Sequence, residues 1–444
     1  MALIHGKTPP CTIEQLELFE PLATCIQVER SAAVAHYSIS SLDGSTNILE
    51  FVMQGSGDQY VDLSRTKLYL KCRIMRSDGT NLPANVEVGP CNNFLATLFS
   101  QCDIFLNDKM VTSSNNLYPF RAYFEQILNY SQATSQKQLT AQMFYLDSPS
   151  YHNSNSANNT GFASRKNLAT RSRVMEMMGP LFADVMSQGN YLVNNVDVRV
   201  RLSRSTDTFC LMDFGTPAAG AVAAVAGNAK VVIDTAILYF HKVSLNPSAQ
   251  LGIESMLREK NAIYNMQRHD LKSFTIPGGS TTFTREHISL GLSPKYAIIG
   301  LLDTAAVQGN YEMNPFLFEG AGVKQISLNV DGMQVPMNGI NVDFTNSNCI
   351  EGYQSLIEVI GKYRVDQPFM FSYTDYMKGN ALYGFQLAPE IIPGAFNLVH
   401  NANIRLDIKF ANATTKNLTV LICFAYDSAM EVNQNREIFY DFST

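Results

Sequence analysis

Apolar and polar residues alternate along much of this chain with a period of two, which is the spacing of a β-strand with one buried face. In KLYLKCRIM (67–75), leucine, cysteine and isoleucine alternate with lysine, tyrosine and arginine. VDVRVRL (196–202) alternates valine and leucine with aspartate and arginine in the same way. Each pattern predicts a strand that turns one face toward a core and the other toward solvent or a neighbouring surface.

Other segments extend this pattern over the whole chain. Further strands are predicted at 48–54, 229–243, 270–276, 281–290, 295–302, 382–387, 403–410 and 417–427. Helical spacing of apolar residues is best at 118–129, 247–260 and 350–360. Strands this numerous, separated by glycine, asparagine, aspartate and proline turns, favour β-sandwiches over βαβ units.

One local unit occurs twice, more than two hundred positions apart. Residues 100–111 read SQCDIFLNDKMV and residues 324–335 read KQISLNVDGMQV, and both are strand–turn–strand patterns of the same polarity. The pair Asn107-Asp108 aligns with the pair Asp331-Gly332, and both pairs favour a tight reversal of the chain.

The elements that follow each hairpin also recur in the same order. AYFEQI (122–127) aligns with GYQSLI (352–357), and both belong to helical segments with one apolar stripe. VDVRVRL aligns with IRLDIKF, which sets Val196 on Ile404, and a long strand then closes each unit. The shared order predicts a tandem duplication of one β domain.

A helix is predicted to connect the two units. NPSAQLGIESMLREKN offers Asn246 or Ser248 as a cap and Pro247 as the first helical residue. A rigid helical link would fix the units relative to each other, whereas a flexible linker would not. We therefore divide the chain into an N-terminal arm (1–45), a first sandwich (46–250) and a second sandwich with a C-terminal tail (251–444).

Composition and charge narrow the functions that need to be considered. Of the 444 residues 46% are hydrophobic and 16% are charged, and the net charge is −6. The length suits two domains of about 200 residues each, and the low charged fraction is compatible with a surface that other subunits cover. Arg165, Lys166, Arg171 and Arg173 form the densest basic cluster, which favours a solvated loop over a phosphate site. Dominant, direct binding of nucleic acid is therefore not predicted.

Cysteine usage and hydropathy indicate a protein made inside the cell. Eight cysteines are scattered without a CxxC pair, and several lie in apolar strand patterns, as expected of buried thiols in a reducing compartment. The start, MALIHGKTPPC, lacks the long apolar stretch of a secretory signal. The longest run of small apolar residues, 218–227, is too short to span a bilayer.

Motifs for catalysis or cofactor binding are weak. The seven histidines show no HxH or HExxH spacing, and His269-Asp270 is a neighbour pair whose side chains point to opposite sides of a strand. GSGDQY (55–60) and GAGVKQ (320–325) begin like phosphate loops but lack a third glycine and GK[ST], so turn glycines explain them better. We predict no enzyme activity and no catalytic, cofactor-binding or metal-binding residues. Dispersed carboxylates leave one alternative open, a tandem β-sandwich carbohydrate-binding module or glycosidase.

Longer blocks of the chain resemble a known family. They read FVMQGSGDQYVDLSRTKLYLKCRI, CNNFLATLFSQCDIFLNDKMV, NLYPFRAYFEQILNY, NNVDVRVRLSRSTDTFCLM and NPFLFEGAGVKQISLNVDGMQVP. These blocks, spread over roughly 45–440, are similar to hexon-type double jelly-roll major capsid proteins of Polinton/Maverick elements and adintoviruses, a lineage that resembles adenovirus hexon.

The resemblance implies an all-β fold of two eight-stranded antiparallel jelly rolls in tandem, with a few short helices. It implies a homotrimer whose six jelly rolls form a pseudo-hexameric capsomer, and trimers that tile an icosahedral shell around double-stranded DNA. A separate penton protein would fill the vertices, and the chain would reside in the virion after assembly in the nucleus or the cytoplasm. The duplication then has a geometric reason, because two similar barrels per chain turn three-fold symmetry into six-fold tiling.

The same reading assigns roles to the ends and the loops of the chain. We expect 1–45 and the tail 435–444 to make contacts between subunits or at the base of the capsomer. We expect 131–170 and 211–228 to form an outward crown, because polar stretches such as SQATSQKQLTAQ and YHNSNSANNTG are typical of exposed loops. The negative net charge predicts that separate basic proteins contact the DNA.

Overall fold

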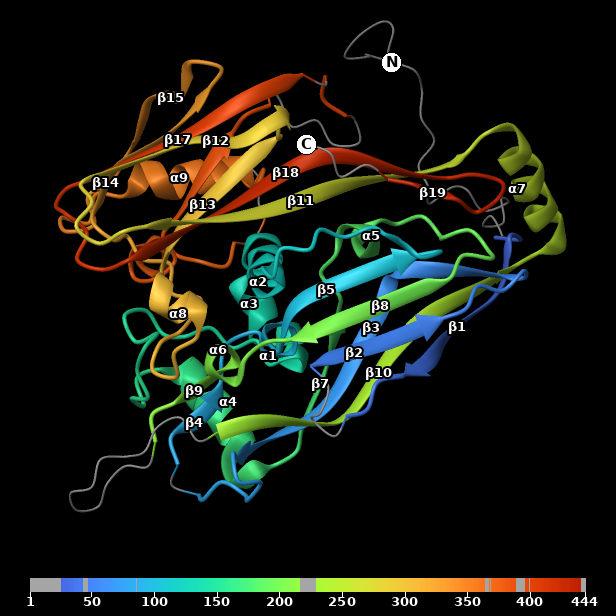
Figure 1. The fold of residues 1–444 in the computed structure, drawn as a ribbon, viewed down its shortest axis with the longest axis horizontal. Helices are drawn as coiled ribbons and strands as arrows, with labels where there is room; N and C mark the ends of the chain where they lie inside the picture. Colours follow the sequence, from blue (N-terminus) through green and yellow to red (C-terminus); the bar gives the residue numbers. More distant parts are fainter. Residues whose placement is uncertain are drawn as a thin grey trace, which may run out of the picture.

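The computed structural model describes residues 25–42, 47–84, 86–215, 229–363, 367, 369–388, 396–398 and 400–440. These residues form two β-sandwiches stacked on each other, with the first coloured blue to green and the second yellow to red in Figure 1. Helix α7 (Pro247–Glu259) joins them at one end of the molecule.

Eight strands form the first sandwich as two antiparallel sheets. One sheet has the order β1 (Val28–Tyr37), β10 (Ala229–Leu245), β3 (Gln59–Arg76) and β7 (Met175–Pro180). The other has the order β2 (Ile48–Met53), β8 (Val198–Arg204), β5 (Phe99–Leu106) and β6 (Lys109–Met110). A small additional sheet pairs β4 (Val88–Pro90) with β9 (Leu211–Asp213). The helices of this unit are α1 (Phe94–Thr97), α2 (Tyr118–Asn129), α3 (Gln132–Ser135), η2 (Gln138–Gln142), α4 (Thr160–Ala169), η3 (Thr170–Ser172), α5 (Asp184–Ser187) and α6 (Asp207–Cys210).

The second sandwich is built in the same way. One sheet has the order β11 (Ala262–Ile276), β18 (Leu418–Val432), β13 (Tyr296–Asp303) and β16 (Leu382–Gln386), with β19 (Ile438–Phe439) added to β18. The other has the order β12 (Thr282–Leu292), β17 (Asn401–Phe410), β14 (Val323–Val330) and β15 (Met333–Asn341). Its helices are α8 (Thr304–Gln308), α9 (Ile350–Val359) and α10 (Tyr373–Met377).

The two sandwiches share one strand order. When the eight main strands of each are counted from its N-terminal end, both have sheets 1-8-3-6 and 2-7-4-5. This order is that of a jelly roll, in which two Greek keys fold into a pair of four-stranded sheets. The chain is therefore a double jelly roll, and the fold class predicted from the sequence is confirmed.

The hairpins predicted at 100–111 and 324–335 are present, and their turns are alike. Asn107 and Asp108 have φ of 46° and 64°, and Asp331 and Gly332 have φ of 48° and 89°. Two successive positive φ angles are the conformation of the tight turn that favours asparagine, aspartate and glycine. The same polar and glycine residues thus build the same turn twice.

The register of the next strand corrects the sequence alignment. Leu106, the residue before the first turn, pairs with Val198, and Val330, the residue before the second turn, pairs with Ile404. Ile404 therefore corresponds to Val198, and its alignment with Val196 is wrong. A shift of two residues keeps every side chain on its face of the sheet, so the alternation of apolar and polar residues cannot detect it.

The connecting helix and the two other predicted helices are confirmed. Asn246 caps α7 by accepting a hydrogen bond from the backbone N–H of Ser248 at 2.9 Å, and Pro247 is the first helical residue. The predicted segments 118–129 and 350–360 correspond to α2 and α9. The division into an arm and two sandwiches stays a prediction.

Several strands lie outside the segments that the sequence pattern predicts. Most of β1 is exposed, and its sequence VERSAAVAHY is rich in alanine, so no apolar–polar alternation marks it. It nevertheless pairs with β10 along its length, which places a strand of the first sheet inside the predicted arm. The short strands β4, β7 and β9 were missed too, and β11 begins at Ala262 rather than at 270.

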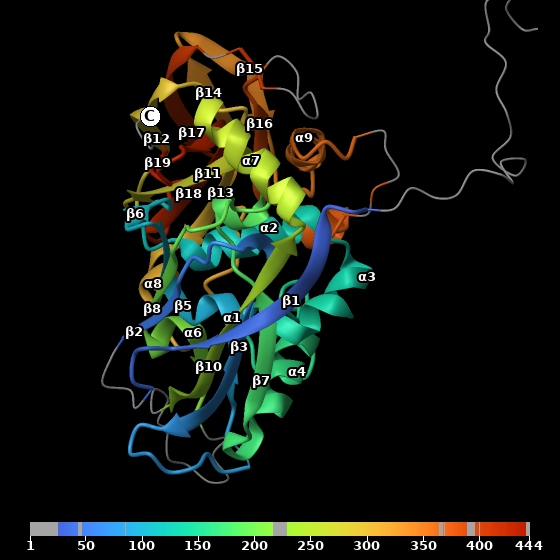
Figure 2. The same ribbon diagram turned by 90° about the vertical axis from the view of Figure 1, so that its right-hand side faces the viewer.

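The long connections leave from one end of each jelly roll. Because strand direction alternates along an antiparallel roll, the connections β3–β5, β6–β7 and β8–β10 share one end of the first roll. The connections β13–β14 and β15–β16 share the corresponding end of the second roll. These connections carry α1 to α4 and α8 to α10, and Figure 2 shows α3 and α4 on one flank of the molecule with α9 above them.

Candidate functional site: the junction between the two jelly rolls

Helix α2 of the first roll packs its aromatic face on the second roll. The Tyr123 ring stacks on the Phe316 ring with centroids 4.5 Å apart and planes 16° apart. The Phe120 ring meets Phe316 edge-on at 5.7 Å, and the Phe124 ring lies 5.5 Å from the Phe318 ring. Aromatic pairs of this kind contribute about 0.5–1.5 kcal/mol each beyond their buried area. The junction is therefore part of a hydrophobic core that both rolls share.

A charged cluster lies beside this aromatic contact. Arg121 of α2 forms ion pairs with Asp184 of α5 at 2.7 Å and with Glu125 at 2.8 Å. Asp184 also accepts a hydrogen bond from the backbone N–H of His269 in β11, at 3.0 Å. Burial opposes ionisation of Asp184, but the charge of Arg121 and the hydrogen bonds from His269 and Arg121 outweigh it, so the pKa of Asp184 lies well below its usual range. The ionised carboxylate thus ties β11 of the second roll to the first roll.

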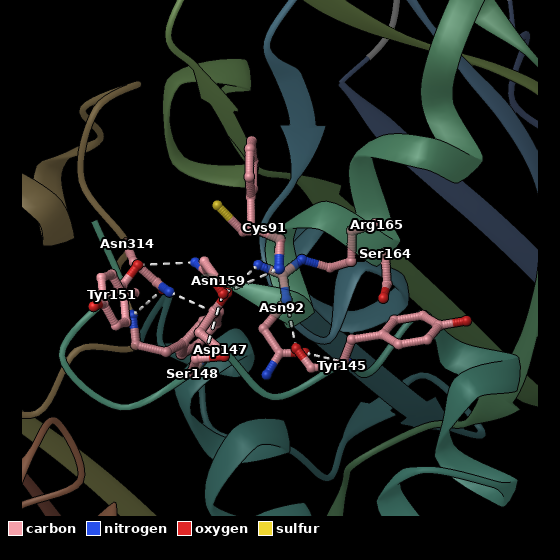
Figure 3. Close-up of polar contacts among 12 residues, drawn as sticks. Cys91, Asn92, Tyr145, Asp147, Ser148, Tyr151, Asn159, Ser164, Arg165 and Asn314 are labelled. Atoms are coloured by element: carbon pink, nitrogen blue, oxygen red, sulfur yellow. Dashed lines mark hydrogen bonds and ion pairs between the residues drawn. The ribbon is translucent and has the colours of Figure 1, made fainter. Parts of the chain in front are cut away.

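A second buried ion pair organises the loop before α4. Arg165 and Asp147 are 2.7 Å apart, and their side chains are 0% and 2% exposed. Asp147 accepts a further hydrogen bond from the side-chain amide of Asn314, a residue of the second roll, at 2.7 Å. Figure 3 shows Asp147 between Arg165 and Asn314, so this carboxylate links the two rolls.

Other polar contacts complete this network. Arg165 donates through Nε to the carbonyl of Pro90 at 2.8 Å and through Nη1 to the carbonyl of Tyr145. Asn159 donates to the carbonyl of Tyr151 at 2.9 Å, and its own side-chain oxygen caps α4. These contacts satisfy the guanidinium of Arg165 and the amide of Asn159, which lowers the free-energy cost of burying both side chains.

This network corrects two expectations from the sequence. The polar insert within 131–165 is not a simple exposed loop, because it contains α3, η2 and part of α4 and buries Phe144 and Phe162. Arg165 does not belong to a solvated basic cluster, since it lies inside the molecule, while Lys166 is paired with Glu87 at 2.6 Å. Each of these polar side chains, considered alone, predicts an exposed loop. In the folded chain they form hydrogen bonds and ion pairs with one another.

The C-terminal tail packs onto the same junction. The guanidinium of Arg436 donates to the backbone carbonyl of Asn194 at 2.9 Å and pairs with Glu254 of α7. Ile438 and Tyr440 are buried in the core of the first roll. The described part of the tail thus joins both rolls to the connecting helix. Residues 441–444 and 1–24, for which contacts between subunits were expected, lie outside the described residues.

The His269-Asp270 pair and the two glycine motifs pack against other parts of the chain. His269 faces Asp184 at 3.5 Å and does not pair with Asp270, which lies 3.6 Å from Lys272. In GSGDQY, a side chain at Gly55 would come within 2.6 Å of the backbone of Val196. In GAGVKQ, a side chain at Gly320 would meet the Phe344 ring at 2.5 Å. These glycines permit close packing at turns.

Cysteines behave as buried hydrophobic residues in the described part of the chain. Six of the seven cysteines there are buried and unpaired, and Cys25 is exposed. Burial raises the pKa of Cys72, Cys91, Cys102 and Cys423 to about 12. Such thiols stay protonated at neutral pH and are poor nucleophiles.

Neither a metal-ligand cluster nor a membrane-spanning helix is found among the described residues. In those ranges no group of three or more His, Cys, Asp or Glu side chains gathers as metal ligands. No helix built from them combines the length and the hydropathy needed to cross a bilayer.

Among the described residues, exposed apolar side chains lie at several places outside the junction. Met333 and Met337 project from β15, an edge strand, and Met337 is 86% exposed. Leu398, 90% exposed, lies near Phe396 in the connection before β17. Leu251 and Met256 are exposed on α7. Long edge strands and exposed apolar patches mark surfaces that other protein chains cover.

The region 211–228, expected to belong to the crown, is described only in part. Leu211–Asp213 is the buried strand β9 rather than a loop, because it pairs with β4. Residues 216–228 lie outside the described residues.

Comparison with known sequences finds a relative of similar length in a nematode. No protein-family model matches the chain. An uncharacterized protein of Caenorhabditis elegans is 23% identical over 408 residues, which cover 88% of this chain and 91% of that protein.

Solved structures of viral proteins resemble the whole chain. A chain from the cryo-EM structure of the Sputnik virophage aligns with a TM-score of 0.67 and 12% identity, over 100% of this chain and 95% of that chain. The mavirus major capsid protein aligns with a TM-score of 0.53 and 12% identity, over 99% and 97%. The Faustovirus major capsid protein aligns with a TM-score of 0.53 and 7% identity, over 93% and 92%. These likenesses, at such low identity, concern the fold, and they agree with the double jelly roll derived from the strand order.

Proposed function

We propose that this chain is a major capsid protein that builds a viral shell. The observation that carries the proposal is that one chain contains the same jelly-roll strand order twice, held rigidly by a shared core. The likeness to the mavirus and Faustovirus major capsid proteins over nearly the full length supports it. A structural protein also accounts for buried histidine, cysteine and carboxylate side chains that serve packing rather than chemistry.

The assembly follows from geometry. Three copies around one axis place six similar rolls in a ring, so a homotrimer acquires a nearly hexagonal outline that can tile an icosahedral shell around double-stranded DNA. A regular hexagonal outline requires that the two rolls of each chain keep a fixed orientation relative to each other. The Tyr123–Phe316 stack and the Asp147 and Asp184 ion pairs provide that rigidity.

Contacts between subunits would use the exposed apolar places and open edges. The head-to-tail contacts of a trimer join two different patches of the chain. The edge strands β1 and β15, together with Leu398 and the exposed face of α7, supply such patches. We place the crown at the end of the rolls that carries α1 to α4 and α8 to α10, and we place the terminal segments 1–24 and 441–444 in contacts at the base or between subunits.

Several finer assignments belong to the same proposal. The division into an arm, a first roll and a second roll follows the predicted boundaries, with the arm shortened so that β1 belongs to the first roll. We place the chain in the Polinton/Maverick and adintovirus lineage because of the sequence blocks that resemble it. A penton protein would fill the vertices, the virion would be the place of function, and basic proteins rather than this chain would contact DNA.

Light scattering coupled to size-exclusion chromatography tests the proposal. The full chain is expected to elute at three times the 49.3 kDa of one subunit, and electron micrographs are expected to show particles with a hexagonal outline. Met337→Asp and Leu398→Asp should weaken the trimer or its tiling, whereas Glu358→Lys, on the exposed part of α9, serves as a surface-charge control. A monodisperse monomer at high concentration would contradict the proposal, and salt-sensitive binding of the trimer to DNA would contradict the assignment of DNA contact to other proteins.

A further inference from the structure

A polar cavity of about 280 Å³ lies where the two rolls meet at the end with the long connections. Its volume is close to the lower end, about 300 Å³, of known small-molecule sites. The first roll contributes α3, the loop 145–149 and the start of α4, and the second roll contributes α10 and its surroundings. The side chains that line the cavity include Gln132, Gln136, Tyr145, Ser164, Phe371 and Asp375.

The walls of the cavity are held in place before any ligand arrives. Asp147, on one wall, is fixed by Arg165 and Asn314, as Figure 3 shows. Ser148 and Thr160 bond to each other at 3.1 Å. On the opposite wall, Ser372 and Asp375 form a reciprocal cap at the start of α10. A preformed site loses little conformational entropy on binding.

The lining has the chemistry of a neutral, polyhydroxylated ligand. Gln132 and Gln136 are exposed, so their amides offer both donors and acceptors to solvent. Asp375 and Ser164 add a carboxylate and a hydroxyl, while Tyr145 and Phe371 add aromatic surface. A sugar ring presents hydroxyl groups at its edge and C–H groups on its face. The polar side chains of the lining can hydrogen-bond to the hydroxyl groups, and the aromatic side chains can pack against the C–H groups.

Other ligand classes fit this lining less well. Among the described residues that line the cavity none is a lysine or an arginine, so a phosphate or another anion would meet the carboxylate of Asp375 without a cation in the lining to bind it. Serine, threonine, glutamine, asparagine and aspartate make up most of the lining, which does not suit a lipid chain. A neutral polar ligand remains the best match.

We propose that this cavity binds one neutral sugar ring of a glycan. Binding rather than hydrolysis is expected, because both oxygens of Asp147 already accept hydrogen bonds, from Arg165 at 2.7 Å and from Asn314 at 2.7 Å. Asp147 therefore cannot act with Asp375 as the acid–base pair of a glycosidase. If the proposed capsid function holds, the cavity belongs to the crown and faces the host surface. This location rests on the proposed function, whereas the sugar binding itself does not.

Saturation-transfer NMR with the full chain tests the proposal. The probes are the methyl glycosides of glucose, galactose, mannose and N-acetylglucosamine, each at about 10 mM, a concentration suited to Kd values near 1 mM. At least one glycoside is expected to bind, and the double variant Gln132→Ala/Gln136→Ala is expected to bind it at least about tenfold more weakly. Ser164→Trp should fill the cavity and abolish binding.

Gln138→Ala provides a matched control, because Gln138 is an exposed glutamine of the same segment outside the cavity. It should bind like the parent chain, and all variants should share the parent's unfolding midpoint. Failure of every glycoside to bind would overturn the proposal, as would binding that survives both the double alanine variant and Ser164→Trp. Displacement of the sugar by inorganic phosphate would overturn the assignment to a neutral ligand. The oligomeric state, measured separately by light scattering, keeps this result distinct from the test of the capsid function.

Discussion

Replacing Arg165 by methionine tests whether the buried ion pair holds the two rolls together. Arg165→Met keeps much of the side-chain volume but removes three hydrogen bonds, to the carbonyls of Pro90 and Tyr145 and to Asp147. Asp147, 2% exposed, then keeps only the amide of Asn314 as a partner. Removing one member of a buried pair costs about 3–5 kcal/mol, because it leaves an uncompensated buried charge.

The loss is a large fraction of the stability of a typical protein, which is about 5–15 kcal/mol. In urea denaturation followed by tyrosine fluorescence and circular dichroism, Arg165→Met should lower the midpoint by about 1 M. Adding Asp147→Asn should recover part of this loss, because the neutral amide removes the orphaned charge and still accepts a bond from Asn314. Arg173→Met, at an exposed arginine of the same segment, should leave the midpoint unchanged. Equal midpoints for the two single variants would refute the reasoning.

Three further predictions concern the junction and the core. Phe316→Ala should cost about 3–5 kcal/mol, because it removes a ring that stacks on Tyr123, and limited proteolysis should then cut the chain between the rolls; resistance equal to that of the parent would argue against a shared core. The lowered pKa of Asp184 contributes stability that is present above the unfolded pKa of about 3.9 and is lost as the pH falls toward the folded pKa. Asp184→Asn should therefore be less stable than the parent at pH 7 and should lose less stability on acidification. A pH profile of stability parallel to that of the parent would contradict this. Gly300→Ala should destabilise the second roll, because its new side chain would lie 2.5 Å from the Phe318 ring. Gly252→Ala on α7 has open space around the new side chain and should be neutral or stabilising by about 0.5–1 kcal/mol. Thermal melts compare the two variants, and a lower melting temperature for Gly252→Ala than for Gly300→Ala would refute the prediction.

Local rules of the sequence were enough to recover the repeated unit. The hairpins, the helices α2, α7 and α9 and the alternating strands depend on turn residues, caps and apolar spacing, which act over a few neighbouring positions. The same rules failed for β1, whose exposed alanines leave no alternation. They also failed for the alignment of Val196 with Ile404, because a shift of two residues preserves the pattern.

The candidate site was much less accessible to sequence reasoning. The apolar stripe of α2 correctly indicated a buried face, but the pattern does not say which partner covers it, and that partner is Phe316, nearly two hundred positions away. Arg165 and Asp147 each read as surface residues, and no local signal links them to Asn314. The sequence contained one indication of a buried polar network, because aspartate, asparagine and arginine cluster in an insert that also contains phenylalanine and tyrosine.

By itself, then, the order of residues determined two like-built β-sandwiches and a helix between them, because strands, turns and caps are specified by near neighbours. Only the tertiary structure decided how the rolls meet, which polar groups are buried and where a cavity remains. Those outcomes depend on contacts between segments that are distant in the sequence. A charged side chain can be buried there only when folding places an oppositely charged or hydrogen-bonding partner beside it.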